Sequence, residues 1–311
     1  MIARKNTSTC IVALLVLQAL WLTAAHSQQP GRPAFADEAR KQEAIYQSRG
    51  ENVPSGYVVG RSLLSYVSTL PAGFDRALAE LGPSDRWLDI GAGEGNAVLD
   101  YYTELYDAMH WEGRERRGRK ARAVAISIED RRTPEWRQTA ARLAPDQIRY
   151  LHGKRMREYS TEELGRFQLV TDVVGGFSYT RYLSAFMEKV LSVMDVNATF
   201  YTLLLDVRPE TEPDPALYKD LLFLTEIENA DGSNVKVCSW LKSISCVKVT
   251  CELNTDLKRP FELYRIQKVC DKVAVPPLVP LSYEAGTPPP RRYRLVSPRA
   301  AALEKPGPIG Q

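Results

Sequence analysis

The sequence predicts an α/β fold: a doubly wound, mostly parallel sheet with helices on both faces and closing antiparallel strands at its C-terminal side. Two observations predict this fold. Short apolar strands alternate with helical segments between residues 55 and 207, which is the pattern of a parallel sheet. After residue 233, three segments have β-like composition, as expected of closing strands.

The N-terminus has the features of a secretory signal. Arg4 and Lys5 precede an apolar run from Ile11 to Ala25, and Ser27 adds a second small residue for cleavage. The run is shorter than the roughly 20 residues that a membrane span needs. We therefore expect cleavage near Ser27, export to the periplasm or the exterior, and no integral span afterwards. An uncleaved anchor is the alternative.

The chain divides into four predicted parts. They are a signal peptide (1–27), a flexible lead with an N-terminal helix (28–54), one large domain (55–275) and a Pro/Arg-rich tail that is extended or disordered (276–311). The 311 residues carry a formal net charge of +3, which is too small to indicate a nucleic-acid partner.

Within the domain, the periodicity predicts each element in turn. The first half carries a helical segment (56–70), a strand (87–90), a helix (97–109), a solvated basic loop (111–122), a strand (123–128), a helix (134–143) and a strand (147–151). The second half carries a strand (169–174), a helix (182–194), a turn (195–198), a strand (199–207), a helix (216–227) and three β-like segments (234–240, 246–253 and 261–269).

The stretch "WLDIGAGEG" holds the main functional signal. Its strand runs directly into Gly91, Gly93 and Gly95, and a helix follows. Glycine permits a tight turn and a close approach of a ligand to the backbone, and the helix start offers amide donors. Asn96 stands where the dinucleotide pattern needs a last small residue, which argues against nicotinamide and flavin cofactors. A purely structural turn is the alternative.

With Asp89 two places before Gly91, this stretch resembles the first motif of the class I S-adenosylmethionine-dependent methyltransferases, a Rossmann-like family. The resemblance implies that the glycine loop lies against the cofactor and that Asp89 helps to anchor its amino end. Ser127 holds the place of the acid that usually grips the ribose, with Glu129 two residues later, and Lys154 replaces an aspartate near the adenine. The predicted S-adenosylmethionine site comprises Asp89, Gly91, Ala92, Gly93, Gly95, Ser127, Glu129 and Asp172.

The resemblance says less about the methyl acceptor. The fourth strand ends in "TDVVGG" instead of the N-P-P-Y of enzymes that methylate exposed nitrogen, which disfavours a DNA base. We expect a small-molecule or protein acceptor, with Asp172 orienting it and Tyr179 lining its pocket. The alternative for Asp172 is a carboxylate paired with backbone amides. A general base is optional, because the donor carbon is already activated.

The predicted compartment raises a second reading of function. S-adenosylmethionine is a cytoplasmic metabolite, so an exported enzyme needs a supply of its donor. One hypothesis is therefore a methyltransferase, and the other is an exported binding protein that reuses the methyltransferase fold without catalysis.

The four cysteines of the predicted mature chain indicate disulfides. Cys238, Cys246, Cys251 and Cys270 are clustered in an exported chain, and their spacing does not suit a metal site. Three pairings are open. A hairpin that turns near residues 256–259 favours Cys246 with Cys270, and Cys238 with Cys251 as the companion pair. The same hairpin would place Lys248 opposite Lys268, which is unfavourable.

Overall fold

The computed structural model describes residues 60–103, 121–180, 182–205, 225–254, 261–281 and 293–296. The predicted signal peptide and N-terminal lead lie outside these residues. The helices are α3 (Leu63–Thr69), α4 (Phe74–Ala79), α5 (Asn96–Asp100), α7 (Pro134–Ala140), the 3-10 helix η2 (Met156–Glu158), α8 (Thr161–Leu164), α9 (Gly176–Tyr179), α10 (Leu183–Val193) and α11 (Val237–Ser243).

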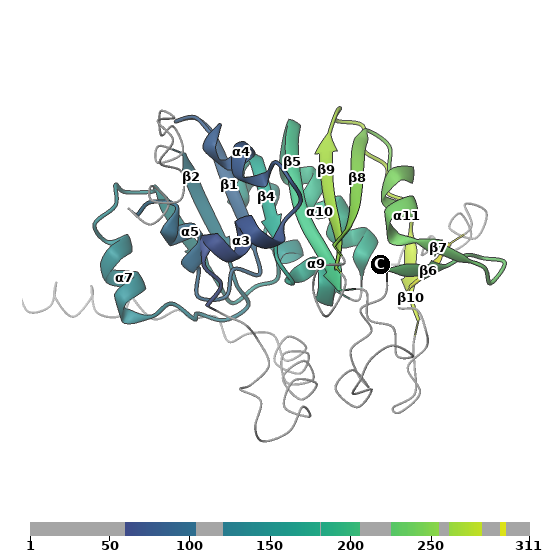
Figure 1. Cartoon of the computed structure of the whole chain (residues 1–311), viewed down its shortest axis with the longest axis horizontal. Helices are drawn as coiled ribbons and strands as arrows, with labels where there is room; N and C mark the ends of the chain where they lie inside the picture. The colour runs from purple at the N-terminus through teal and green to yellow at the C-terminus, as the bar shows by residue number, and fades with distance from the viewer. Residues whose placement is uncertain are drawn as a thin grey trace, which may run out of the picture. The chain divides into compact units, whose positions relative to one another are not determined.

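A seven-stranded sheet forms the centre of the fold (Figure 1). Its order is β3-β2-β1-β4-β5-β9-β8, built from β1 (Arg86–Ile90), β2 (Arg122–Ile126), β3 (Ile148–Leu151), β4 (Phe167–Asp172), β5 (Met194–Leu205), β8 (Val247–Asn254) and β9 (Phe261–Lys268). The strands from β3 to β5 pair in parallel, whereas β9 is antiparallel to both β5 and β8. The predicted doubly wound sheet with antiparallel closing strands is confirmed.

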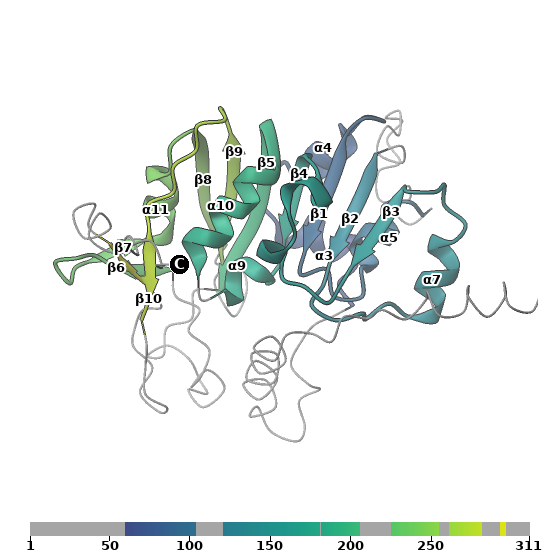
Figure 2. The same ribbon diagram turned by 180° about the vertical axis from the view of Figure 1, so that it is seen from behind.

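Two hydrophobic cores cover the two faces of this sheet. Alternate residues of each buried strand point to opposite faces, so Trp87 joins the core under α3, α4 and α5, while Leu88 joins the core under α10 and α11. Figure 2 shows α10 crossing the second face. Helix α10 buries seven of its eleven residues there, including Phe186 and Met187. The prediction of helices on both faces is therefore confirmed.

A second sheet of four short strands packs beside the main one. Its order is β10-β11-β6-β7, from β6 (Glu226–Glu228), β7 (Asn234–Lys236), β10 (Leu278–Pro280) and β11 (Tyr293–Leu295). Leu278 and Tyr293 belong to the same core as α10. Within the segment expected to be an extended or disordered tail from residue 276, the chain is thus extended at these two strands, and Leu278 and Tyr293 are buried.

Three local predictions also need correction. The segment 234–240 is a strand only as far as Lys236, because α11 begins at Val237. The predicted helix over 216–227 does not reach its end, since residues 226–228 form β6. The turn expected at 195–198 is an irregularity within β5, where Asn197 takes a left-handed φ of 72° and the register against β4 shifts.

Two disulfides join the C-terminal elements in the pairing that the hairpin argument favoured. Cys238 of α11 is bonded to Cys251 of β8, with Cα atoms 6.1 Å apart, and Cys246 is bonded to Cys270, with Cα atoms 5.0 Å apart. The objection to this register was wrong. Lys248 lies opposite Gln267, and Lys268 is buried, with its ammonium donating to the Met194 carbonyl at 2.8 Å.

Candidate functional site

The glycine loop lies where a doubly wound sheet binds its ligands. It follows β1, and the neighbouring strand β4 belongs to the other half of the sheet, so the loop sits at the switch point on the carboxyl edge. Gly91, Gly93 and Gly95 all have left-handed φ angles, of 72°, 57° and 78°. A Cβ on Gly91 would lie 2.7 Å from the Cα of Gly175, which begins the turn after β4. The two turns therefore pack directly against each other.

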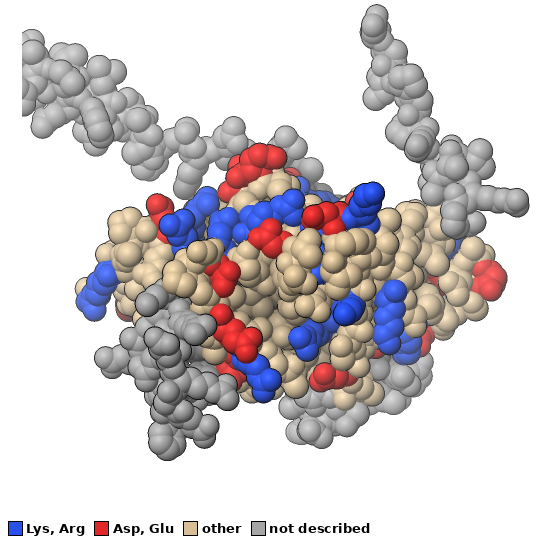
Figure 3. All heavy atoms as spheres, turned by 90° about the horizontal axis from the view of Figure 1, so that it is seen from above, with Lys and Arg blue, Asp and Glu red and all other residues tan. Residues whose placement is uncertain are grey.

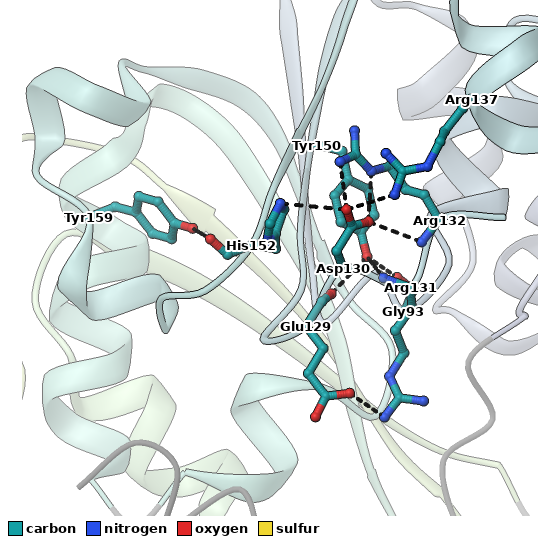
Figure 4. Close-up of polar contacts among 9 residues, drawn as sticks. All are labelled: Gly93, Glu129, Asp130, Arg131, Arg132, Arg137, Tyr150, His152 and Tyr159. Carbon is teal, nitrogen blue, oxygen red and sulfur yellow. Dashed lines mark hydrogen bonds and ion pairs between the residues drawn. The ribbon is translucent and has the colours of Figure 1, made fainter. Parts of the chain in front are cut away.

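Tyr150 of β3 joins the glycine loop to the end of β2 (Figure 4). Its hydroxyl donates a short hydrogen bond to the Gly93 carbonyl and lies 3.2 Å from the Glu129 carbonyl. The indole of Trp136, on α7, donates to the Gly95 carbonyl at 3.1 Å. A Cβ on Gly95 would lie 3.1 to 3.2 Å from the Trp136 and Tyr150 rings, so packing alone favours glycine there.

Asp89 is fully buried beneath this loop. Tyr66 of α3 donates to its two carboxylate oxygens at 3.1 and 3.0 Å, and Thr171 of β4 donates to Oδ1 at 2.7 Å. Burial raises the pKa of the Asp89 carboxyl to about 7, although the hydrogen bonds from Thr171 and Tyr66 lower it. The side chain of Asp89 is not exposed at the site. Its hydrogen bonds hold Tyr66 of α3 in place, so Asp89 fixes the position of α3.

Asp172 is also fully buried, at the end of β4. Its carboxylate accepts from the backbone amides of Gly175 at 2.7 Å and Phe177 at 2.9 Å, which shapes the turn into α9. Burial raises its pKa to about 7. This is the backbone pairing that stood as the alternative to an acceptor-orienting role.

Two acids with ion pairs, Glu129 and Asp130, follow the end of β2. Ser127 is largely buried, and Glu129 is half exposed and forms an ion pair with Arg131 at 2.6 Å. The next residue, Asp130, accepts from Arg132 and Arg137, each at 2.8 Å, and lies 3.6 Å from His152 of the β3 end. Hydrogen bonds from Arg132 hold the pKa of Asp130 well below its usual range. Both acids are therefore paired with arginine, Glu129 with Arg131 and Asp130 with Arg132 and Arg137 (Figure 4).

The remaining predicted residues occupy the same edge. Ala92 is buried, and its amide donates to the Ile126 carbonyl at 2.9 Å, so β2 supports the loop. Tyr179 is the last residue of α9, just beyond Asp172. Lys154 forms an ion pair with Glu163 at 2.9 Å.

The sequence interpretation missed three residues that build this site: Tyr66, Trp136 and Tyr150. Each lay in a segment assigned only to a helix or a strand, because a single aromatic residue in an apolar run looks like an ordinary core position. Their polar atoms bond to Asp89, Gly95 and Gly93 across 23 to 57 residues of sequence, a relationship that periodicity does not reveal.

Among the described residues, no group of three or more His, Cys, Asp or Glu side chains is arranged to hold a metal ion. None of the described helices has the length and apolar character needed to cross a membrane.

No family model matches the sequence, and no curated protein matches it either. Solved structures with a related arrangement include an rRNA methylase from Streptococcus thermophilus, with 12% identity, coverage of 63% of this chain and 94% of its own, and a TM-score of 0.38.

A second is the 1,6-didemethyltoxoflavin-N1-methyltransferase of Burkholderia thailandensis, solved with S-adenosylhomocysteine, with 13% identity, coverage of 86% and 94%, and a TM-score of 0.40. A third is a possible exported protein from Bordetella parapertussis, with 16% identity, coverage of 75% and 79%, and a TM-score of 0.39. In its strand order and glycine turn, the chain is similar in fold to class I S-adenosylmethionine-dependent methyltransferases.

Proposed function

We propose that the chain is an S-adenosylmethionine-dependent methyltransferase that acts on a small molecule or a protein. One observation carries the proposal: the left-handed glycine loop lies at the switch point of the doubly wound sheet, and the Tyr150 hydroxyl holds Gly93 beside Glu129. A backbone free of side chains and a neighbouring carboxylate suit a ligand that carries a ribose and an amino acid end.

The fit of the residues to this cofactor differs along the site. Gly93 fits it directly, because it adds no side chain. Glu129 is half exposed and pairs with Arg131, so it would bind a ribose hydroxyl with the carboxylate oxygen that this ion pair leaves open. Ser127 and Ala92 would support them from beneath. Asp89 is buried and would act through Tyr66, on α3.

The chemistry of methyl transfer makes modest demands on the protein. The cofactor supplies a methyl group on a sulfonium, so the chain has to align the acceptor, exclude water and, for some acceptors, accept a proton. Asp172 and Tyr179 are our candidates near the acceptor. Since Asp172 accepts two backbone amides, we propose that it positions the turn into α9, the helix that ends at Tyr179.

Calorimetry with S-adenosylmethionine and S-adenosylhomocysteine tests the proposal. We expect wild-type protein to bind both, and Gly93→Ala to weaken binding at least about tenfold, because a left-handed Cβ disturbs the loop. Gly232→Ala is the matched control. Gly232 has a left-handed φ of 80° in the turn between β6 and β7, and a Cβ there would meet nothing within 4 Å. Absence of binding to the folded wild-type chain would contradict the proposal.

The second candidate is an exported binding protein that reuses the fold without catalysis. The two disulfides suit export, which both candidates share, and do not distinguish between them. Both candidates include cleavage near Ser27, which mass spectrometry of the exported chain tests by an N-terminus at or next to Gln28. Transfer of a labelled methyl group to small molecules or proteins from the same compartment separates them, because the binding protein would hold the cofactor and transfer nothing.

A further inference from the structure

A polar cavity lies at the other edge of the sheet from the glycine loop. Its volume is about 330 Å³, and it lies between α4 and the face of β4, β5 and β9. Gln168 and Leu169, which line it, stand near the start of β4, whereas the glycine loop follows the end of β1. Figure 3 looks down on this edge, where acidic and basic side chains are mixed.

Tyr201 of β5 forms part of the cavity wall and is 1% exposed. Its ring packs edge-on against Phe74 of α4, with the centroids 5.6 Å apart. A Cβ on Gly73, another lining residue, would lie 3.8 Å from the Tyr201 hydroxyl, so this oxygen faces the cavity. Within the described part of the chain, the hydroxyl has no hydrogen-bond partner. The hydroxyl can therefore exchange a hydrogen bond with a polar group of a molecule in the cavity.

Three charged side chains that line the cavity are also uncommitted. Arg76 and Glu80 lie one turn apart at α4, and Arg265 projects from β9. None of these three side chains has an ion pair or a hydrogen bond to any described residue. By contrast, the Gln168 amide is fully engaged, because it accepts from the Arg86 amide at 2.7 Å and donates to Asp195 at 2.5 Å. The groups available to a ligand are therefore two guanidinium groups, one carboxylate and one phenol.

These groups specify a class of ligand. Two arginines suit a carboxylate, which they can bind with paired N–H donors, and Glu80 suits an ammonium group. Ala77, Leu81 and Leu169 offer apolar surface for a short side chain. The volume is at the lower end for small-molecule sites. We infer that this cavity, bordered by Arg76, Glu80, Arg265 and the Tyr201 hydroxyl, binds a small zwitterion of the α-amino acid class.

Ligand-observed NMR on the full chain, with a mixture of the protein amino acids as the probe, tests the inference without S-adenosylmethionine. We expect at least one amino acid to bind. The tightest binder is then compared with two analogues that keep its carbon skeleton: the carboxylic acid without the amine and the amine without the carboxylate. Each analogue should bind at least about tenfold more weakly, because one charged pair is lost.

Variants connect this binding to the cavity. Arg265→Gln and Arg76→Gln should each weaken it about tenfold, and Tyr201→Phe about threefold. Arg142→Gln is the matched control, since Arg142 is exposed after α7, does not line the cavity and loses the same charge.

Thermal melting of each variant reports whether it has folded, and the exposed Arg76 serves if Arg265→Gln does not fold. The inference is overturned if no amino acid binds, if either analogue binds as tightly as its parent, or if the cavity variants behave like Arg142→Gln.

Discussion

Among the described residues, Asp89 has three hydrogen-bonding contacts and no ion pair, so its charge is poorly compensated in the protein interior. Burial raises its pKa to about 7, whereas Thr171 and Tyr66, and more weakly the charge of Arg61, favour the ionised form and Asp172 disfavours it. The native state therefore binds the proton more tightly than an unfolded chain, whose aspartates titrate near roughly 3.9. By linkage, this residue makes the protein less stable as the pH rises from about 4 to about 7.

We expect Asp89→Asn to reduce the fall in melting temperature between about pH 5 and about pH 8, because the amide keeps partners for Tyr66 and Thr171 and does not titrate. Asp130→Asn should act at lower pH. The pKa of Asp130 is lowered in the folded state, so its stabilisation is present above the unfolded pKa of roughly 3.9 and is lost in acid, and the variant should remove this acid-dependent part of the melting temperature. Melting curves from about pH 3 to about pH 8 check both variants, and parallel curves for wild type and Asp89→Asn between about pH 5 and about pH 8 would contradict the prediction for Asp89.

At the scale of elements, two tyrosines hold opposite ends of the same strands. Tyr150 joins the glycine loop to the segment after β2, at the carboxyl edge. Tyr102, after α5, donates to the Ala121 carbonyl at 2.7 Å and the Gln147 carbonyl at 3.0 Å, before β2 and β3 begin. Each hydroxyl thus connects two backbone segments, but only Tyr150 lies at the proposed cofactor site.

Tyr150→Phe should therefore loosen the glycine loop, whereas Tyr102→Phe should affect only the far edge. We expect hydrogen exchange to increase about fivefold at residues 92–96 and 129–131 in the first variant alone, since one hydrogen bond is worth roughly 1 kcal/mol. Affinity for S-adenosylmethionine should fall in the same variant. Equal exchange at these residues in the two variants would show that the Tyr150 hydroxyl does not order the loop.

Features that depend on residues close together in the sequence could be predicted, and features that depend on contacts between distant segments could not. The parallel strands were predicted, because the alternation of strands and helices and the burial of both sheet faces leave a local pattern of apolar residues. The glycine turn also carries a local signature. The roles of Tyr66 and Tyr150 depend on contacts between distant segments. The start of α11 at Val237 was missed because a short β-like run precedes it, and its packing against β8 selects the helix.

At the scale of the whole molecule, the compartment and the stability are linked through the C-terminal disulfides. Cys238–Cys251 ties α11 to β8 across 13 residues, and Cys246–Cys270 ties the two ends of the closing hairpin across 24 residues. Each closed loop of this length restricts the unfolded chain by about 3 kcal/mol in the chain-entropy description. A chain folded in a reducing compartment would lack this contribution.

We therefore expect a chain beginning at Gln28 and produced in a reducing cytoplasm to expose four reactive thiols when denatured, and exported chain to expose none. The reduced form should melt lower by on the order of 10 °C, and oxidation should restore the difference. The double variant Cys246→Ser with Cys270→Ser isolates one bond, and we expect it to lose about half of the effect. Thiol counting and melting curves on the same samples decide the matter: exported protein with four free thiols, or reduced and oxidised forms that melt together, would contradict the link between export and stability.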